Sequence, residues 1–124
     1  MTFLDTSIII DFLAGDQKIV DIVREISNKE DVKTTTITEY ELLRHKTKIR
    51  KQAAERFLSA AIVCSFDREA AKKAALLFEE LQNTGRMINE NDLLIAGISL
   101  AHDEVLLTRD KKLASIGKEK IVTV

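Results

Sequence analysis

The chain has 124 residues with 45% hydrophobic and 31% charged side chains, a composition typical of one globular domain, here expected to span residues 1–124. Its 19 Lys and Arg against 20 Asp and Glu give a net charge of −1, so any binding of nucleic acid needs a local basic patch. No apolar run approaches the roughly 20 residues that span a bilayer, and the single Cys excludes an internal disulfide and a multi-Cys zinc site.

Strands and helices are expected to alternate along the chain. Apolar or β-branched runs predict strands at 2–4, 32–37, 62–66, 105–108 and 121–124. Helical periodicity predicts helices at 7–13, 17–27, 39–45, 51–61, 68–83, 90–102 and from 111 to near 117. Alternation of this kind implies parallel pairing through right-handed crossovers. We therefore expect a three-layer α/β domain, with a central parallel sheet of four to five strands and helices on both faces.

Several helix starts carry capping residues. Asp16, Asp67, Asn89 and Asp110 are predicted N-caps. The pattern Thr38-x-x-Glu41 is a capping box that predicts a helix start at this point.

Four acidic residues are expected at one edge of this sheet. In an open parallel sheet, functional sites lie outside the carboxyl ends of the strands. Asp5 follows the first strand and Asp110 the fourth, Glu41 lies one helical turn beyond the second, and Asp92 lies in the first turn of the helix leading into the fourth. Each acid also has a structural interpretation: Glu41 in a capping box, Asp92 near a helix dipole and Asp110 as an N-cap. Asp5 could be a merely solvated charge, although the end of a strand is a poor place for one. Their predicted coincidence at one edge favours a functional site.

Converging carboxylates repel one another unless something neutralises them. The usual partner is a hard divalent cation such as Mg²⁺ or Mn²⁺, which prefers oxygen ligands and substrate phosphates. The chain has no His/Cys cluster suited to zinc. This acid pattern therefore indicates metal-assisted phosphodiester or phosphate-ester chemistry.

Four short motifs, in order, resemble those of PIN-domain ribonucleases, most closely the VapC-type toxins of toxin–antitoxin pairs. They are Leu4-Asp5-Thr6-Ser7, Glu41-Leu42-Leu43-Arg44, Asn91-Asp92-Leu93-Leu94-Ile95-Ala96 and Leu107-Thr108-Arg109-Asp110-Lys111. The chain departs from the family pattern at two positions, with His45 where a Gly is frequent and Gly97 where an Ala is frequent.

The resemblance implies a Mg²⁺- or Mn²⁺-dependent endoribonuclease that uses water as the nucleophile. Carried over by position, it implies that Asp5, Glu41, Asp92 and Asp110 are the catalytic, metal-binding acids. A homodimer and a VapB-type antitoxin that covers the active groove are implied as partners. Thr6 and Thr108 are expected to support the acids by orienting a metal-bound water or the substrate phosphate. A cytoplasmic location without membrane association is expected from the missing export signals.

A basic run, Arg44-His45-Lys46-Thr47-Lys48-Ile49-Arg50-Lys51, begins three residues after Glu41 and could attract an RNA backbone. The candidate RNA contacts are Arg44, Lys46, Lys48, Arg50, Arg86 and Arg109. The run could equally be a solvated connection between two helices.

Two other functions stay open. A PIN-like protein could process RNA, or bind it as a scaffold, without a toxin role. A phospho-acceptor receiver domain would use Asp67 after the third strand, but it gives no role to Glu41 or Asp92.

Overall fold

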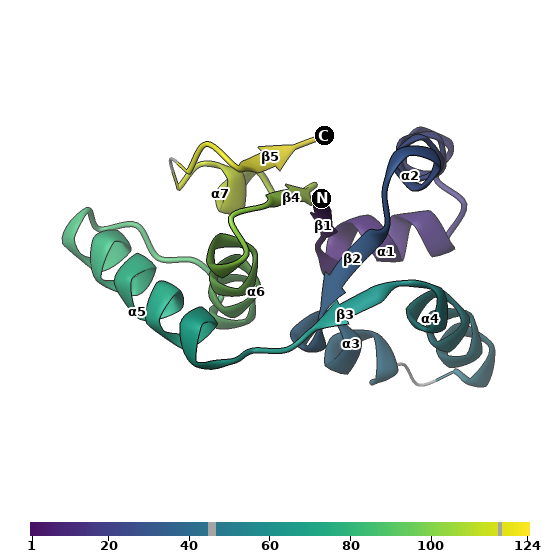
Figure 1. The fold of residues 1–124 in the computed structure, drawn as a ribbon, viewed down its shortest axis with the longest axis horizontal. Helices are drawn as coiled ribbons and strands as arrows, with labels where there is room; N and C mark the ends of the chain where they lie inside the picture. The colour runs from purple at the N-terminus through teal and green to yellow at the C-terminus, as the bar shows by residue number, and fades with distance from the viewer. Residues whose placement is uncertain (45–46, 117) are drawn as a thin grey trace.

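The computed structural model describes residues 1–44, 47–116 and 118–124 (Figure 1). His45 and the expected RNA contact Lys46 lie outside the described residues. The elements in chain order are β1 (Thr2–Leu4), α1 (Thr6–Leu13), α2 (Gln17–Lys29), β2 (Val32–Thr35), α3 (Thr36–Leu43), α4 (Lys48–Ala60), β3 (Ile62–Cys64), α5 (Arg68–Asn83), α6 (Glu90–Ala101), β4 (Val105–Thr108), α7 (Lys111–Ala114) and β5 (Ile121–Thr123).

Five parallel strands form one sheet in the order β3-β2-β1-β4-β5, which confirms the predicted parallel α/β fold. β1 is the central strand, and its residue Phe3 pairs with Lys33 of β2 and Leu106 of β4. Because all strands run in the same direction, their carboxyl ends lie at one edge, where the loops after β1 and β4 are neighbours.

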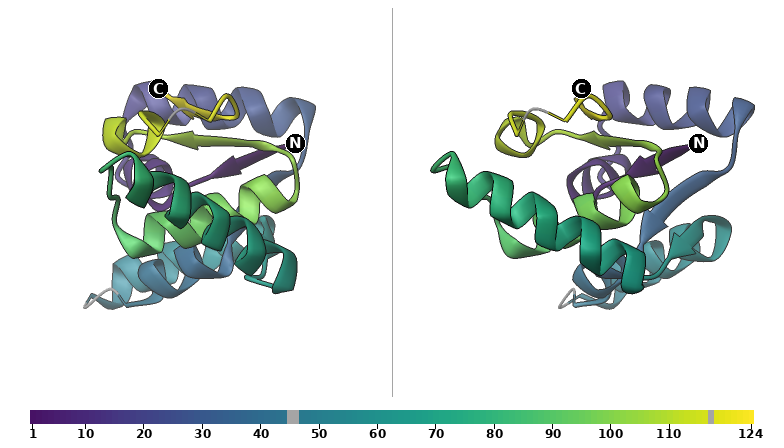
Figure 2. Two further views of the ribbon diagram at one scale, coloured as in Figure 1. Left: turned by 90° about the vertical axis from the view of Figure 1, so that its left-hand side faces the viewer. Right: turned by 60° about the vertical axis from the view of Figure 1, so that its left-hand side comes forward.

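Helices cover both faces of this sheet (Figure 2). Successive side chains of a strand point to opposite faces, so Phe3 and Leu106 face one layer while Leu4 and Leu107 face the other. The first layer is formed mainly by α5 and α6, and the second by α1 to α4. Two apolar cores, one on each face, therefore hold the carboxyl edge of the sheet in place.

The predicted N-caps are confirmed at four helices. Asp16, Asp67, Asn89 and Asp110 each accept a backbone N–H of the first helical turn. The caps at Asn89 and Asp110 determine where α6 and α7 begin.

The start of α3 differs from the prediction. The expected strand at 32–37 ends at Thr35, and the helix expected at 39–45 runs from Thr36 to Leu43. The reason is that the Thr35 hydroxyl, not that of Thr38, accepts the capping hydrogen bond, from the backbone N–H of Thr38 at 3.1 Å. The expected Thr38–Glu41 capping box is therefore wrong, and the Glu41 carboxylate is left for another partner.

One close approach joins α5 to α6. A Cβ built on Gly97 of α6 would lie 2.8 Å from the carbonyl oxygen of Ala70 and 2.8 Å from the Cβ of Ala74. The glycine lets the two helices pack at this short distance. Within the described ranges, no helix combines the length and the apolar character needed to cross a membrane.

Candidate active site

Asp5 stands at the end of the central strand and is almost completely buried, at 3% exposure. Its Oδ1 atom accepts the Ile8 backbone N–H at 3.1 Å and the Ser7 hydroxyl at 2.6 Å. Its Oδ2 atom accepts the Thr108 hydroxyl at 2.5 Å. Burial raises the pKa of this carboxyl, and the hydrogen bonds from Ser7, Thr108 and Ile8 oppose that rise by stabilising the charged form. Asp5 is thus a buried carboxylate with its orientation set on both oxygens.

Glu41 lies on α3, the helix that follows β2. Its Oε1 atom accepts the Thr6 hydroxyl at 2.8 Å, and the same hydroxyl lies 3.1 Å from Thr38 Oγ1. Thr6 is the first residue of α1, so this bond connects the helix after β1 to the helix after β2. The hydrogen bond orients Glu41 toward the edge where Asp5 lies.

Asp92 and Asp110 are neighbouring acids that interact directly through a hydrogen bond. Asp92 lies in the first turn of α6, and Asp110 caps α7 through the backbone N–H groups of Lys112 and Leu113. Burial raises the pKa of Asp92 to about 6, and the negative charges of Asp110, Asp5 and Glu41 add to this effect. A hydrogen bond with Asp110 also favours the protonated form of Asp92. The structure thus brings the other three expected acids within electrostatic reach of Asp92.

The four acids fit a hard divalent cation through their chemistry, although they do not form a closed cage. Among residues 1–44, 47–116 and 118–124, no three His, Cys, Asp or Glu side chains converge closely enough to hold an ion together. Burial is the main cause of the raised pKa of Asp92, and the negative charges of Asp110, Asp5 and Glu41 raise it further. Carboxylate oxygens and excess negative charge are what Mg²⁺ and Mn²⁺ select, with water and substrate phosphate completing the coordination.

The two threonines expected beside the acids are both in contact with them. Thr6 donates to Glu41, and Thr108 donates to Asp5. Thr108 is completely buried, and its oxygen also accepts the Asp110 backbone N–H at 2.9 Å. These hydroxyls therefore orient carboxylates, and their expected action on a metal-bound water or the substrate phosphate stays a prediction.

Ser7 is a site residue that the sequence reasoning missed. Its hydroxyl donates to Asp5 Oδ1 and accepts the backbone N–H of Arg109 at 3.1 Å. It therefore connects the loops after β1 and β4 in the same way as Thr108. Its place two residues after Asp5, within the first turn of a helix that Asp5 caps, was the available signal.

The candidate RNA contacts differ in their surroundings. The Arg109 guanidinium pairs with Asp11 at 3.2 Å and Asp16 at 2.8 Å, and so it is already neutralised. Arg86 donates to the Ser115 carbonyl oxygen at 2.9 Å. Arg44 lies over the ring of Tyr40. Lys48 and Arg50 are exposed at the start of α4.

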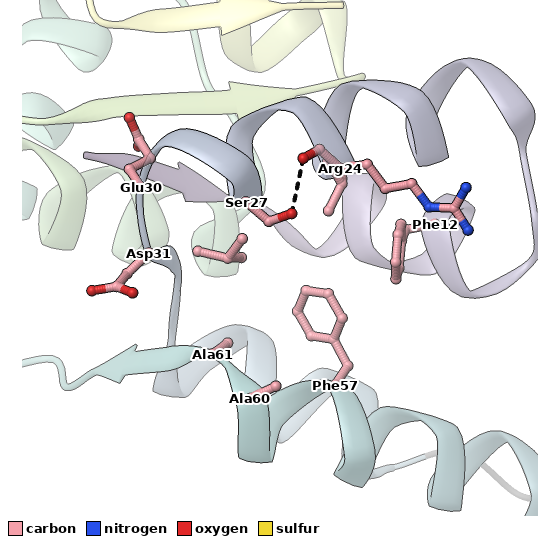
Figure 3. Close-up of a pocket in the computed structure, with 10 residues that line it drawn as sticks. Phe12, Arg24, Ser27, Glu30, Asp31, Phe57, Ala60 and Ala61 are labelled. Carbon is pink, nitrogen blue, oxygen red and sulfur yellow. Dashed lines mark hydrogen bonds between the residues drawn. The ribbon is translucent and has the colours of Figure 1, made fainter.

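A separate apolar hollow of about 380 Å³ lies between α2 and α4 (Figure 3). Phe12, Val23 and Phe57 line its apolar part, with Glu30 and Asp31 near the start of β2. None of the four clustered acids lines this hollow, so it is distinct from the candidate active site.

Comparison with known proteins gives a consistent result. Residues 2–119 match the protein family described as "PIN domain". The chain is 28% identical over 109 residues, covering 87% of each sequence, to Ribonuclease VapC19 of Mycobacterium tuberculosis (strain ATCC 25618 / H37Rv).

Solved structures with a similar fold come from VapBC assemblies. The structure of VapBC-1 from nontypeable Haemophilus influenzae superimposes with a TM-score of 0.79 at 25% identity, covering 93% of this chain and 90% of that one. DNA-bound VapBC from Salmonella typhimurium gives a TM-score of 0.85 at 23% identity, covering 98% and 96%. At 23% identity, the similarity to the Salmonella typhimurium structure concerns the fold alone.

Proposed function

Because this chain belongs to the PIN-domain family, we propose that it is a divalent-metal-dependent endoribonuclease whose active site is the acid cluster at the carboxyl edge of the sheet. The observation that carries the proposal is the position of Asp92, whose pKa is raised by burial and by the charges of Asp110, Asp5 and Glu41. Asp5 and Asp110 also cap helices, but capping does not require four carboxylates from distant segments to lie near one another. A cation-dependent reaction on a phosphate gives a reason for their convergence.

We further propose that the chain is the toxin of a type II toxin–antitoxin pair, acting in the cytoplasm as a homodimer held inactive by a VapB-type antitoxin. Support comes from the name of its curated relative and from the VapBC assemblies among the similar structures. An RNA-processing nuclease, or an RNA-binding scaffold, is the second candidate. The receiver-domain alternative is set aside, because the family is a different one and Asp67 serves as the N-cap of α5.

In the proposed reaction, Asp92 and Asp110 hold the cation, with Asp5 and Glu41 contributing directly or through water. The bound Mg²⁺ or Mn²⁺ would supply a Lewis acid that lowers the pKa of a water nucleophile and neutralises charge on the phosphoryl oxygens. The role of Thr108 and Ser7 is to keep both Asp5 oxygens in a single orientation. Thr6 does the same for Glu41. Since the pKa of Asp92 is raised to about 6, this carboxyl is mostly charged only above that pH in the metal-free protein.

The test is a cleavage assay on mixed structured RNA at low salt, with Mg²⁺, Mn²⁺ or EDTA. The wild type should cleave with either ion, and both EDTA and Asp92→Asn should abolish cleavage. Asp67→Asn is the matched control, because it removes a carboxylate charge outside the cluster while keeping an N-cap side chain, and should leave cleavage intact. Folded wild-type protein, free of copurified inhibitor, that cleaves no RNA with any of these ions would contradict the proposal. A neighbouring reading frame for an antitoxin would favour the toxin role over RNA processing.

A further inference from the structure

A second hollow, of about 620 Å³, lies between the α5–α6 connection and α7. Its volume falls in the range of small-molecule sites, roughly 300–1,000 Å³. It is lined by Gly85, Arg86, Met87, Ile88, Lys112, Ser115 and Ile116. The hollow shares no lining residue with the pocket of Figure 3, and it belongs to a different part of the molecule.

Arg86 joins the two walls of this hollow. After α5 the chain turns at Gly85, whose φ of +71° is a conformation that favours glycine. The Arg86 backbone N–H then donates to the Leu81 carbonyl at 2.8 Å, and its guanidinium donates to the Ser115 carbonyl at 2.9 Å. These two hydrogen bonds attach the α5–α6 connection both to α5 and to the end of α7. They therefore fix the two sides of the hollow relative to each other.

Both walls lead directly into the acid cluster. Ile88 lies four residues before Asp92, and Lys112 lies two residues after Asp110. At 3.8 Å between consecutive Cα atoms, these wall residues are at most about 15 Å from the acids by chain length alone. A polymer whose backbone is cleaved at the acids would extend to this hollow within a few of its units.

The lining combines two cationic residues, Arg86 and Lys112, with apolar residues. Lys112 is exposed, and no carboxylate in the described ranges pairs with its ammonium group. Arg86 uses one guanidinium nitrogen for Ser115 and keeps further N–H donors. Met87 is 47% exposed, while Ile88 and Ile116 are half-buried. By contrast, the Arg109 guanidinium on the other side of Asp110 is neutralised by two carboxylates.

We propose that this hollow binds one nucleotide of a single-stranded RNA substrate, adjacent to the bond cleaved at the acid cluster. Lys112 contacts the phosphate, Arg86 contacts the phosphate or the plane of the base, and Met87 packs against the base. Unstacked bases of single strands present faces and edges that such a surface can contact, and paired A-form RNA does not. The inference rests on the proposed ribonuclease function and assigns part of its substrate path.

The test measures binding and cleavage separately. Binding of a fluorescein-labelled 16-nucleotide single-stranded RNA to the full chain is followed by anisotropy, in an Asp92→Asn background that prevents turnover. Lys112→Gln should weaken binding about 3- to 10-fold at 50 mM salt and reduce the salt slope by about 0.7, the value for one single-strand phosphate contact. Lys29→Gln is the matched control, because it removes a charge at the end of α2, on the opposite edge of the sheet.

Cleavage kinetics with otherwise wild-type protein complete the test. Lys112→Gln and Met87→Ser should raise KM several-fold with a smaller change in kcat, while Lys29→Gln leaves both unchanged. Arg86→Lys, which keeps the charge but loses the planar group, should have an intermediate effect. Circular dichroism spectra identify any variant that fails to fold.

The two proposals fail in different ways. If wild type cleaves RNA and Lys112→Gln binds and cleaves like Lys29→Gln, the nucleotide site is wrong and the ribonuclease function stands. The same result is expected if the hollow instead receives an acidic peptide. If no RNA is cleaved but binding still depends on Lys112, the ribonuclease function fails and the RNA site stands.

Discussion

Thr108 and Asp5 are 103 positions apart in the chain, yet the Thr108 hydroxyl donates a hydrogen bond of 2.5 Å to Asp5 Oδ2. The contact is possible because β1 and β4 are adjacent parallel strands in which Leu4, the last residue of β1, pairs with Leu107, so that Asp5 and Thr108 follow side by side. The same hydroxyl oxygen accepts the backbone N–H of Asp110. One buried hydroxyl therefore sets the position of one candidate metal-binding acid and of the backbone that carries another.

Thr108→Val should disturb both acids at once. The substitution keeps the β-branched shape but leaves Asp5 Oδ2 and the Asp110 N–H without this partner. Loss of a hydrogen bond to a buried charged group costs about 2 kcal/mol of unfolding free energy. Because the lost bond had favoured the charged form, the pKa of Asp5 should rise further. Urea denaturation at pH 7 and RNA cleavage rates would measure the two effects, and we expect at least a tenfold loss of cleavage.

Thr108→Ser is the control for this prediction. Serine retains the hydroxyl, so cleavage should stay within a few-fold of wild type despite some loss of packing. Equal cleavage rates for the Val and Ser variants would show that the hydroxyl does not position Asp5.

Asp92→Asn should change how stability depends on pH. The folded-state pKa of Asp92 is about 6, above its ordinary value of 3.8. The folded protein therefore binds this proton more tightly than the unfolded chain, and stability falls as pH rises from about 4 to about 6. Asparagine does not titrate, so the variant does not lose stability over this pH range. In EDTA it should be about 1 kcal/mol more stable than wild type above pH 6, allowing for solvent screening of a half-buried group, and equal to it below pH 4.

Urea unfolding at a series of pH values would test this expectation. A stability difference between Asp92→Asn and wild type that is constant from pH 4 to pH 8 would contradict the raised pKa of Asp92 in the folded protein. A variant less stable than wild type at pH 8 would do the same.

The order of elements was predictable because their signals are local. Asp67 and Asn89 cap helices with side chains that contact the next few residues, so short sequence patterns identify them. The α3 start was mispredicted because the run from Thr34 to Thr38 offers several β-branched hydroxyl residues in succession. Strand propensity and capping ability coincide in threonine, and only the packed structure selects Thr35 as the cap.

The positions of the acids at the sheet edge were also predictable, since topology determines that edge. Their partners were not. The contacts of Ser7 with the Arg109 backbone and of Thr6 with Glu41 span 102 and 35 residues. Such contacts depend on strand order and on the relative positions of helices, which no single motif encodes. For the same reason, the ion pairs of Arg109 with Asp11 and Asp16 could not be foreseen.

A divalent cation should stabilise the folded protein in a pH-dependent way. At pH 7.5 Asp92, whose pKa is raised to about 6, is mostly charged, and Mn²⁺ or Mg²⁺ that binds only the folded state raises the melting temperature by mass action. At pH 5 Asp92 is mostly protonated, so the rise should be much smaller. Differential scanning fluorimetry with and without 5 mM ion would measure it. The same rise in Asp92→Asn as in wild type would place the ion elsewhere.

Arg109→Gln should separate structural from RNA-binding roles of a basic residue. Because its guanidinium is paired with Asp11 and Asp16, its loss should weaken the attachment of the α1–α2 turn to the loop after β4. The salt slope of RNA binding should remain as in wild type, whereas Lys112→Gln should reduce it. Anisotropy titrations from 50 to 200 mM salt would compare the two variants. A slope reduced by about 0.7 in Arg109→Gln would show that it contacts phosphate after all.

Gly97→Ala tests the close approach of α5 and α6. Helix propensity alone predicts that alanine stabilises a helix interior by about 1 kcal/mol over glycine. Here the new methyl group would meet the Ala70 carbonyl oxygen and the Ala74 Cβ at 2.8 Å. A backbone carbonyl cannot rotate away, and overpacking of this kind costs about 1–3 kcal/mol. We therefore expect a net loss of about 1 kcal/mol in urea unfolding. Combined with Ala74→Gly the loss should be partly relieved, whereas the exposed Ala75→Gly should be additive with it. A gain in stability from Gly97→Ala alone would show that the helices can separate at this point without cost.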